Sequence, residues 1–431
     1  MALSESIRFA GDVNIDKIEI VSSNGFIQNV TNQVIAIEIF EDLYSPFISG
    51  NVVLKDSLDL ANLFPFVGEE FINIKIHTPT LDGATQVIDT QFYIFKMSNR
   101  ELMGDRNVVY QLHFTSPEAI VDVNKKLSKV YEGKISDIAK KLVTEKIYGL
   151  ESKKKLNLEP TANSVKYISN YWSPVKNLNY IAGNATNTSD AASFVFFENR
   201  NGFNFVSLES LFKGGIKQEF IYDSYIRDNG ALNTSIRNIE EEYKRIVDIS
   251  IPEAYDYMDR SMSGMFSSKI ITADLTTKRY SVKNFDMLST FSKNVHLNTY
   301  PLASKKNIQR PSSLTITYPK EYGLFNGYTD VTNAKIIQKR ISSLQQAEAS
   351  KIEITVPGRT DYTVGMKVSV KLNKINPITK TESNDDVIDN MFSGNYLISA
   401  ISHYINREKH ECQMELIKDS FIVDLDKGGK K

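Results

Sequence analysis

The chain has 431 residues, of which 41% are hydrophobic, so it is long enough for about two to four domains with sizeable cores. Its formal net charge of −1 gives no electrostatic reason to expect a nucleic-acid-binding or membrane-surface protein. The single cysteine excludes an internal disulfide framework and favours folding in a reducing cytosol.

The N-terminal residues, MALSESIRFAGDVNID, lack the basic start and apolar run of a signal peptide. No apolar stretch approaches the ~18–20 residues that a membrane-spanning helix needs. We therefore expect a soluble protein that is made in the cytosol and has no segment inserted into a membrane.

Hydrophobic residues alternate with polar ones from about residue 34 to residue 114. In VIAIEIFED, Ile35, Ile37 and Ile39 share one face, and FINIKIH and VVYQLHF repeat the alternation. Turn-rich pieces such as YSPFISGN and HTPTLDG lie between these stretches. Many short alternating strands separated by turns predict an antiparallel barrel or sandwich. We assign residues 1–115 to a first small β-barrel.

A mixed α+β domain is predicted for residues 116–212. Its first part is rich in lysine, and Ile135, Ile138 and Leu142 recur at helical spacing. A second helix is predicted after Ser173, which is a suitable N-cap and is followed by proline. An Asn-Gly pair between two aromatic runs, in FENRNGFNF, predicts a β-hairpin.

Strand patterns return in the second half of the chain. We assign residues 213–250 and 331–425 to a second β-barrel, in which KIEITVPG is a predicted strand. The stretch AKIIQKRISSLQQAEAS is predicted to form a helix of about four turns. Residues 251–330 form an additional subdomain of strands and loops in this interpretation, and residues 426–431 form a frayed tail.

The two ends of the chain resemble each other in the order of their parts. The first half reads VGEEFINIKIHTP, a polar loop, and then QFYIFKMSNRELMGDRNVVYQLHFTSPEAI. The last quarter reads VGMKVSVKLNKI, a polar loop, and then NYLISAISHYINREKHECQMELIKDSFIVD. We interpret this similarity as two copies of one barrel with the α+β domain between them. The alternative is a coincidence between generic strand patterns. The predicted fold is therefore mainly β with an α+β insertion.

The last hairpin contains the chain's only cysteine and two of its five histidines. With the turn at residues 406–409, four pairs of residues oppose each other on one face. These pairs are Ile405 and His410, His403 and Cys412, Ile401 and Met414, and Ser399 and Leu416.

His403, His410 and Cys412 could thus cluster as metal ligands, because directly opposed side chains lie ~5 Å apart. The same face is apolar, however, and zinc sites normally use four protein ligands, or three with an open position. We interpret the three residues as core residues and predict no catalytic, cofactor or metal site.

Other candidate sites are weaker. The acidic residues Asp385, Asp386 and Asp389 lack EF-hand spacing, and the basic stretches ESKKKLNLEP and SKKNIQR are short, so all three segments are predicted to be solvated loops. Trp172 is interpreted as a packing anchor, with a sugar-stacking platform as the alternative. The motifs GxSxG, P-loop, HExxH and GxGxxG are absent, so an enzyme is not expected.

Several phrases in order resemble the central baseplate hub proteins of contractile-tailed bacteriophages of the T-even-like group. They begin with IEIFEDLYSPFISGNVVLKDSLDLANLFPFVGEEFINIKI and continue with SPEAIVDVNKKLSKVYEGKISDIAKKL. SFVFFENRNGFNFVSLESL and SGNYLISAISHYINREKHECQMELIKDSF complete them. Together they extend from about residue 30 to residue 425.

This resemblance implies a homotrimeric ring with two barrels per chain and pseudo-sixfold symmetry. Such a hub adapts a sixfold tail tube to a threefold central spike around a channel through which DNA passes. The implied partners are the chain itself, the spike or needle protein, and tail-tube or tube-initiator proteins. The implied location is the virion tail baseplate, after assembly in the host bacterial cytoplasm.

Two other functions were weighed. A carbohydrate- or receptor-binding tail protein would use aromatic loops such as Trp172 or the segment YDSYIRD. A peptidoglycan hydrolase fused to a hub has no supporting sequence feature, because neither a lysozyme-like segment nor a spike β-helix repeat is visible.

Overall fold

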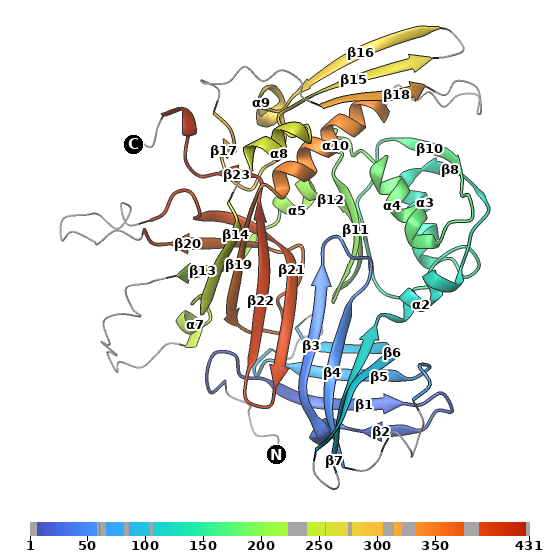
Figure 1. The fold of residues 1–431 in the computed structure, drawn as a ribbon, viewed down its shortest axis with the longest axis vertical. Coiled ribbons are helices and arrows are strands. Elements are labelled where there is room, and N and C mark those ends of the chain that lie inside the picture. Colours follow the sequence, from blue (N-terminus) through green and yellow to red (C-terminus); the bar gives the residue numbers. More distant parts are fainter. Residues whose placement is uncertain are drawn as a thin grey trace, which may run out of the picture.

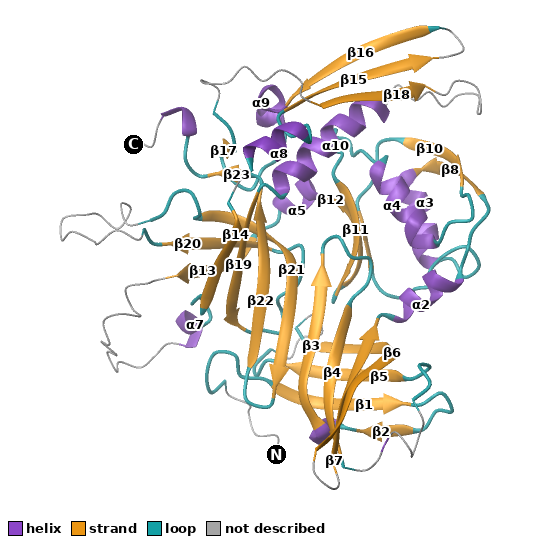
Figure 2. Cartoon of the chain, viewed as in Figure 1, coloured by secondary structure: helices purple, strands orange, loops and turns teal. Residues whose placement is uncertain are grey.

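One large β-sheet dominates the computed structural model of the chain (Figure 2). The described residues are 7–57, 60, 66–81, 86–103, 107–222, 239–254, 256–274, 278–304, 314–320, 333–374 and 388–427. Within them the fold is mainly β, as expected, with antiparallel pairing in most of a 13-stranded sheet. None of the described helices combines the length and the apolar character that crossing a membrane requires.

The N-terminal part of this sheet, called the first unit, contains seven strands. They are β1 (Asn14–Val21), β2 (Ile27–Asn29), β3 (Val34–Asp42), β4 (Ser49–Asp56), β5 (Phe71–His77), β6 (Ile88–Met103) and β7 (Asn107–Thr115). In space they follow the order β2-β1-β5-β6-β7-β4-β3. Alternate residues such as Ile72, Ile74 and Ile76 are buried in one core, as their period of two predicts.

The sequence interpretation of β3 needs one correction. The alternation predicts Ile35 on the same face as Ile37 and Ile39. In the structure the Ile35 side chain is exposed, whereas the other two are buried. The β3–β4 register shifts between Val34 and Ala36. This irregularity takes Ile35 out of the alternation, which resumes at Ala36.

The C-terminal part of the sheet, called the second unit, contains six strands. They are β13 (Ile216–Tyr222), β14 (Asp248–Glu253), β19 (Ser350–Pro357), β20 (Lys367–Leu372), β21 (Gly394–Asn406) and β22 (His410–Lys418). Their spatial order is β13-β20-β21-β22-β19-β14. The first unit without β2 also has six strands, in the order β1-β5-β6-β7-β4-β3. If the six strands of each unit are numbered in chain order, the two spatial orders are identical. The units differ in that the first has the additional strand β2, and in that β13 pairs with β20 in parallel, whereas β1 and β5 are antiparallel.

The two units also share an irregularity in their closing hairpins. The β6–β7 register shifts at Phe95, between Ile94 and Lys96. The β21–β22 register shifts at Ser399, between Ile398 and Ala400. Because the strand order and the position of this bulge agree, the similarity of the two sequence segments corresponds to a similarity in topology.

Strand β21 joins the two units into one sheet (Figure 1). Its N-terminal part pairs with β20, and its C-terminal part pairs with β3, from Ala400 opposite Asp42 to Asn406 opposite Ala36. Ile405 of β21 therefore lies in the core of the first unit rather than in that of the second. The two cores are separate clusters of buried side chains.

A mixed α and β segment separates β7 from β13. It consists of α2 (Pro117–Asn124), β8 (Val130–Lys134), α3 (Ile135–Thr144), β9 (Leu156–Leu158), β10 (Ser164–Ile168), α4 (Pro174–Gly183), β11 (Phe194–Asn199), β12 (Gly202–Ser207) and α5 (Leu208–Phe212). The predicted features are present. Ser173 caps α4 by accepting from the Lys176 N–H, and β11 and β12 form the hairpin at Asn201-Gly202.

A further group of elements lies between β14 and β19. It consists of α8 (Tyr257–Met262), β15 (Ser267–Asp274), β16 (Arg279–Asp286), α9 (Met287–Thr290), β17 (Tyr300–Pro301), β18 (Leu314–Lys320) and α10 (Asn333–Ala347). Strand β15 pairs with β16 and β18, and the helix predicted from AKIIQKRISSLQQAEAS is α10. The short strand β23 (Ser420–Phe421) returns to pair with β17.

Candidate functional site

The hairpin β21–β22 brings together the three metal-ligand types that the sequence analysis singled out. His403 is opposite Cys412, Ile405 is opposite His410, and Ile401 is opposite Met414, as predicted. The fourth predicted pair is wrong, because the bulge at Ser399 places Leu416 opposite Ile398. A bulge adds one residue to one strand, so the register deduced from the turn holds only on the turn side of it.

The ring nitrogens and the thiol of this cluster face one another. Nδ1 of His403 is 3.0 Å from Nε2 of His410. Sγ of Cys412 is 3.3 Å from the first nitrogen and 3.5 Å from the second. All three side chains are fully buried. The structure therefore forms the cluster that the register allowed, on the core face that the apolar pattern indicated.

Burial determines the protonation of the cluster. It lowers the pKa of His403 to about 3, with a smaller contribution from Arg200. Burial also lowers the pKa of His410, and it raises the pKa of the Cys412 thiol. At neutral pH the rings are uncharged and the thiol keeps its proton. One ring N–H then donates to the other ring, whereas Nε2 of His403 and Nδ1 of His410 have no hydrogen-bond partner among the described residues.

A buried acidic side chain lies where the cluster meets the inserted α+β segment. Glu41 of β3 accepts hydrogen bonds from the Thr363 hydroxyl and, at 3.2 Å, from the Val364 N–H. Burial raises the pKa of its carboxyl group, and Arg200 opposes that rise. Arg200 lies in the β11–β12 turn, so this junction connects both units and the insertion.

A second buried charge network corrects the interpretation of ESKKKLNLEP as a solvated loop. The ammonium group of Lys154 is 2.7 Å from Glu118 and 2.6 Å from Glu198, and both carboxylates are largely buried. Glu198 also accepts from the Ile48 N–H at 3.1 Å. The Lys154 neighbours Lys153 and Lys155 are exposed, as expected for a solvated loop. Lys154 instead pairs with two carboxylates of the insertion, and Glu198 connects this network to the first unit through the Ile48 N–H.

Trp172 packs as the sequence analysis favoured. Its ring centre lies 5.2 Å from that of Tyr180 and 6.4 Å from that of Tyr167, and the ring packs against the core of the insertion.

Of the other candidates, Asp389 accepts from the N–H groups of Met391 and Phe392 in a turn. Residues Asp385 and Asp386, and most of YDSYIRD and SKKNIQR, lie outside the described residues.

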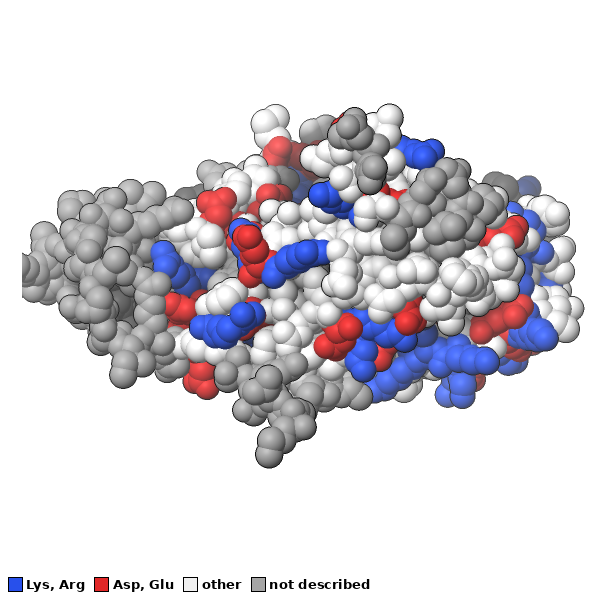
Figure 3. Space-filling view, turned by 90° about the horizontal axis from the view of Figure 1, so that it is seen from below, with Lys and Arg blue, Asp and Glu red and all other residues white. Residues whose placement is uncertain are grey.

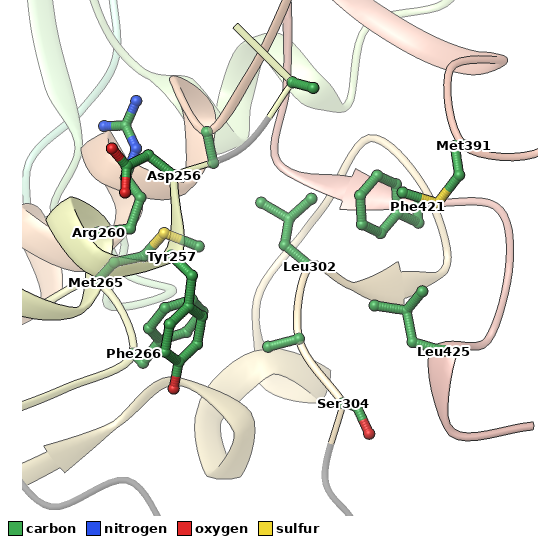
Figure 4. A pocket seen from close by; sticks show the side chains of 13 residues that line it. Asp256, Tyr257, Arg260, Met265, Phe266, Leu302, Ser304, Met391, Phe421 and Leu425 are labelled. Carbon is green, nitrogen blue, oxygen red and sulfur yellow. The ribbon is translucent and has the colours of Figure 1, made fainter. Parts of the chain in front are cut away.

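An apolar cavity was not foreseen from the sequence. It has a volume of about 440 Å³ and lies between α8, the segment after β17, and β23. Phe266 and Tyr257 face Leu302, Phe421 and Leu425 across it (Figure 4). Its lining residues come from segments far apart in the chain, so no local motif could reveal it. With few polar groups to orient a substrate, the cavity is suited to packing rather than to catalysis.

Two strand edges expose apolar side chains. Among the described strands, β14 pairs only with β19, and the C-terminal part of β6 pairs only with β7. Leu102 and Met103 at the end of β6 are 83% and 60% exposed, and Ile251 of β14 is 41% exposed. Open edges with apolar side chains are normally covered in native proteins, so these edges are candidate assembly surfaces.

Charged side chains of both signs are mixed on the face seen from below (Figure 3). Lys and Arg side chains gather toward the right-hand end of this view, with Asp and Glu side chains beside them. The visible part of the described surface therefore lacks the broad basic surface that phosphate binding favours.

Comparison with known proteins gives a consistent result. A probable baseplate hub protein of Vibrio phage KVP40 is 21% identical over an alignment that covers 94% of each chain. A tail protein from Neisseria meningitidis MC58 has a similar structure, with a TM-score of 0.55 and 13% identity over 93% of this chain and 96% of that one.

The 43 kDa tail protein of prophage MuSo2 from Shewanella oneidensis gives a TM-score of 0.54, with 10% identity over 94% of this chain and 98% of that one. No family model matches the chain. The resemblance to phage baseplate hub proteins is thus confirmed at the level of overall sequence, and the fold is that of phage tail proteins.

Proposed function

We propose that the chain is the structural hub of a phage-type tail baseplate. Three copies would form a ring that adapts the sixfold tail tube to the threefold central spike and surrounds the channel for DNA. The similarity to a probable baseplate hub protein along nearly the whole of both chains supports this function.

The repeated strand order is the observation that carries the proposal. Each chain contains β1-β5-β6-β7-β4-β3 and, in the same order, β13-β20-β21-β22-β19-β14. Three chains then supply six similar units. A ring of such units presents a nearly sixfold surface to a tube while keeping true threefold symmetry for a spike. A molecule with one unit per chain would lack this dual symmetry.

The same proposal assigns the parts of the chain. Residues 1–115 form the first barrel, and residues 213–250 with 331–425 form the second. Residues 116–212 and 251–330 are an α+β domain and a further subdomain attached to the ring. In each unit, core side chains come from strands along the whole curved sheet, as a barrel requires.

A structural role fits the chemistry of the described residues. The His403–His410–Cys412 cluster is buried and uncharged, and the apolar cavity contains few polar groups. We infer that the chain is not an enzyme and works in the virion after assembly in the host cytoplasm. Its proposed partners are copies of itself, the spike or needle protein, and tail-tube or tube-initiator proteins, with DNA only in transit.

The alternative, a carbohydrate- or receptor-binding tail protein, has less support. This alternative would use Trp172 as a sugar-stacking platform, but the Trp172 ring is half-buried against Tyr167 and Tyr180. These contacts reduce the aromatic surface of Trp172 that a sugar could stack on.

The proposal is tested by native mass spectrometry and by particle images of the purified chain, alone and with the spike protein of the same phage. We expect a threefold particle with six similar lobes. A chain that stays monomeric at high concentration and does not associate with the spike protein would refute the hub function.

A further inference from the structure

The two units are similar enough to match them residue by residue. In the hairpins, Ile94 and Ile398 both stand immediately before the shared bulge, opposite Phe114 and Leu416. In the first unit, Val108 lies six residues before Phe114 and is opposite Leu102. In the second unit, His410 lies six residues before Leu416 and is opposite Ile405. Leu102 of the first unit therefore occupies the position of Ile405 in the second.

The same matching applies to the outer strands β3 and β14. Ile37 of β3 is opposite Val52, and Val52 is opposite Leu112 of β7. Ile249 of β14 is opposite Ile354, and Ile354 is opposite Met414 of β22. Leu112 and Met414 are themselves equivalent, because Leu112 lies two residues before Phe114 and Met414 lies two residues before Leu416. Ile249 therefore occupies the position of Ile37.

Within one chain, the units meet through β21 and β3. The C-terminal part of β21 pairs antiparallel with β3, and Ile405 is opposite Ile37. Ile405 is fully buried in the core of the first unit by this contact. The contact thus supplies both backbone hydrogen bonds and an apolar side chain for the neighbouring core.

Among the described strands, none pairs with the equivalent edges of β6 and β14. Leu102, the equivalent of Ile405, is 83% exposed, whereas Ile405 has no exposed surface. Ile249, the equivalent of Ile37, is only half-buried, whereas Ile37 is fully buried. Each chain therefore carries both halves of a contact that it already makes once internally.

We propose that β14 of one chain pairs antiparallel with the C-terminal part of β6 of a second copy of this chain. Copying the β21–β3 register places Leu102 opposite Ile249, Glu101 opposite Ser250, and Met103 opposite Asp248 of the neighbouring copy. Leu102 then enters the core of the neighbouring second unit, as Ile405 enters that of the first. This inference rests on the proposed trimeric hub and names the contact that closes it.

Physical considerations favour this contact over other arrangements. An open edge with an exposed leucine invites uncontrolled pairing unless a specific partner covers it. The contact is head-to-tail, because β6 and β14 are different surfaces, so it closes into a ring only if the rotation per unit is correct. The internal β21–β3 contact is of the same kind, and alternating it with the new contact relates successive units by one similar step.

Cysteine cross-linking tests the register. The native Cys412 is fully buried, so engineered surface cysteines report without interference. Glu101 and Ser250 are both exposed, and directly opposed residues on paired strands lie within disulfide reach. We expect E101C with S250C in one chain to give a covalent trimer under mild oxidation, seen by non-reducing electrophoresis. E101C with I249C, whose second cysteine points to the other face of β14, is the matched control.

A substitution tests the apolar contact independently of disulfide geometry. L102D places a charge in the proposed interface and should convert the trimer into monomers in native mass spectrometry. Y280D is the matched control, because Tyr280 is 77% exposed on β16, which the proposal leaves free. The Y280D variant should remain trimeric.

The outcomes separate this inference from the hub function. If the wild-type chain forms no trimer, alone or with the spike protein, the hub function itself fails. If the wild-type trimer forms but E101C/S250C does not cross-link better than its control, the hub stands and this interface is refuted. A trimer that survives L102D would refute it in the same way.

Discussion

Three single residues in the core of the second unit lie as close together as metal ligands do, and we interpret them as packed core residues. The His403, His410 and Cys412 side chains converge, yet the rings are neutral and hydrogen-bonded and the thiol keeps its proton. Metal binding would have to remove the proton of a thiol whose pKa is raised by burial. The equivalent place opposite β6 in the first unit holds Tyr110, which is a buried core residue. The repeat therefore uses this position for packing.

This interpretation predicts that metal removal has no effect. We expect less than stoichiometric metal in the purified chain by elemental analysis, and an unchanged unfolding temperature in EDTA. Cys412→Val should change the free energy of unfolding by about 1 kcal/mol or less, since a buried cysteine packs like a small apolar residue. One tightly held zinc per chain, lost in this variant but retained in Met414→Leu, would show a metal site instead.

The buried imidazoles predict acid sensitivity. The pKa of His403 is about 3 in the folded chain, below its ordinary value of 6.5. Between these pH values the unfolded chain binds a proton that the folded chain does not, so stability falls as pH falls from about 6.5 toward 3. At pH 5 the contribution of His403 is a loss of about 2 kcal/mol relative to pH 7.5. His410, whose pKa is also lowered, acts in the same direction.

Urea unfolding at pH 7.5 and pH 5 measures this effect. His403→Gln removes the titrating group, so the variant should lose less stability between the two pH values than the wild type. An equal loss in both proteins would contradict the protonation assigned to the cluster. Above pH 7.5 the two proteins should show the same pH dependence.

At the scale of elements, the sequence predicted strands and helices well where their pattern is local. The alternation in β5, the Ser173 cap of α4, the helix α10 and the hairpin β11–β12 are all present. Errors occur at bulges, where Ile35 and Ser399 leave the alternation. A bulge depends on how the partner strand packs, and the sequence of one strand does not record it.

The inserted α+β segment provides a test at this scale. Lys154 holds Glu118 and Glu198 at its junction with the first unit, and burial raises the pKa of Glu198. Lys154→Ala leaves two carboxylates without their cation and should lower the free energy of unfolding by about 3 kcal/mol. The exposed neighbour gives the control, since Lys153→Ala should change it by about 0.5 kcal/mol or less. If Lys154→Ala and Lys153→Ala lowered the free energy of unfolding equally, the charge network would be exposed to solvent rather than buried.

At the scale of the whole molecule, association should contribute to stability. Pairing of β14 with β6 of a neighbouring copy covers edges that are open in one chain, so the folded chain is stabilised by mass action. We expect the apparent unfolding temperature of the wild type to rise with protein concentration. The L102D variant should show no such rise, and the Y280D variant should behave like the wild type. A wild-type unfolding temperature independent of concentration would argue against a reversible trimer.

The sequence by itself determined the β class, the order of the parts, the similarity of the two units and the apolar face of the last hairpin. These features follow from periodicity and turn residues, which act between neighbours along the chain. Only the tertiary structure decided that β21 pairs with β3, that Lys154 pairs with two largely buried carboxylates, and that the cavity at Phe266 exists. Each joins segments far apart in the chain, and such contacts depend on the packing of the whole fold.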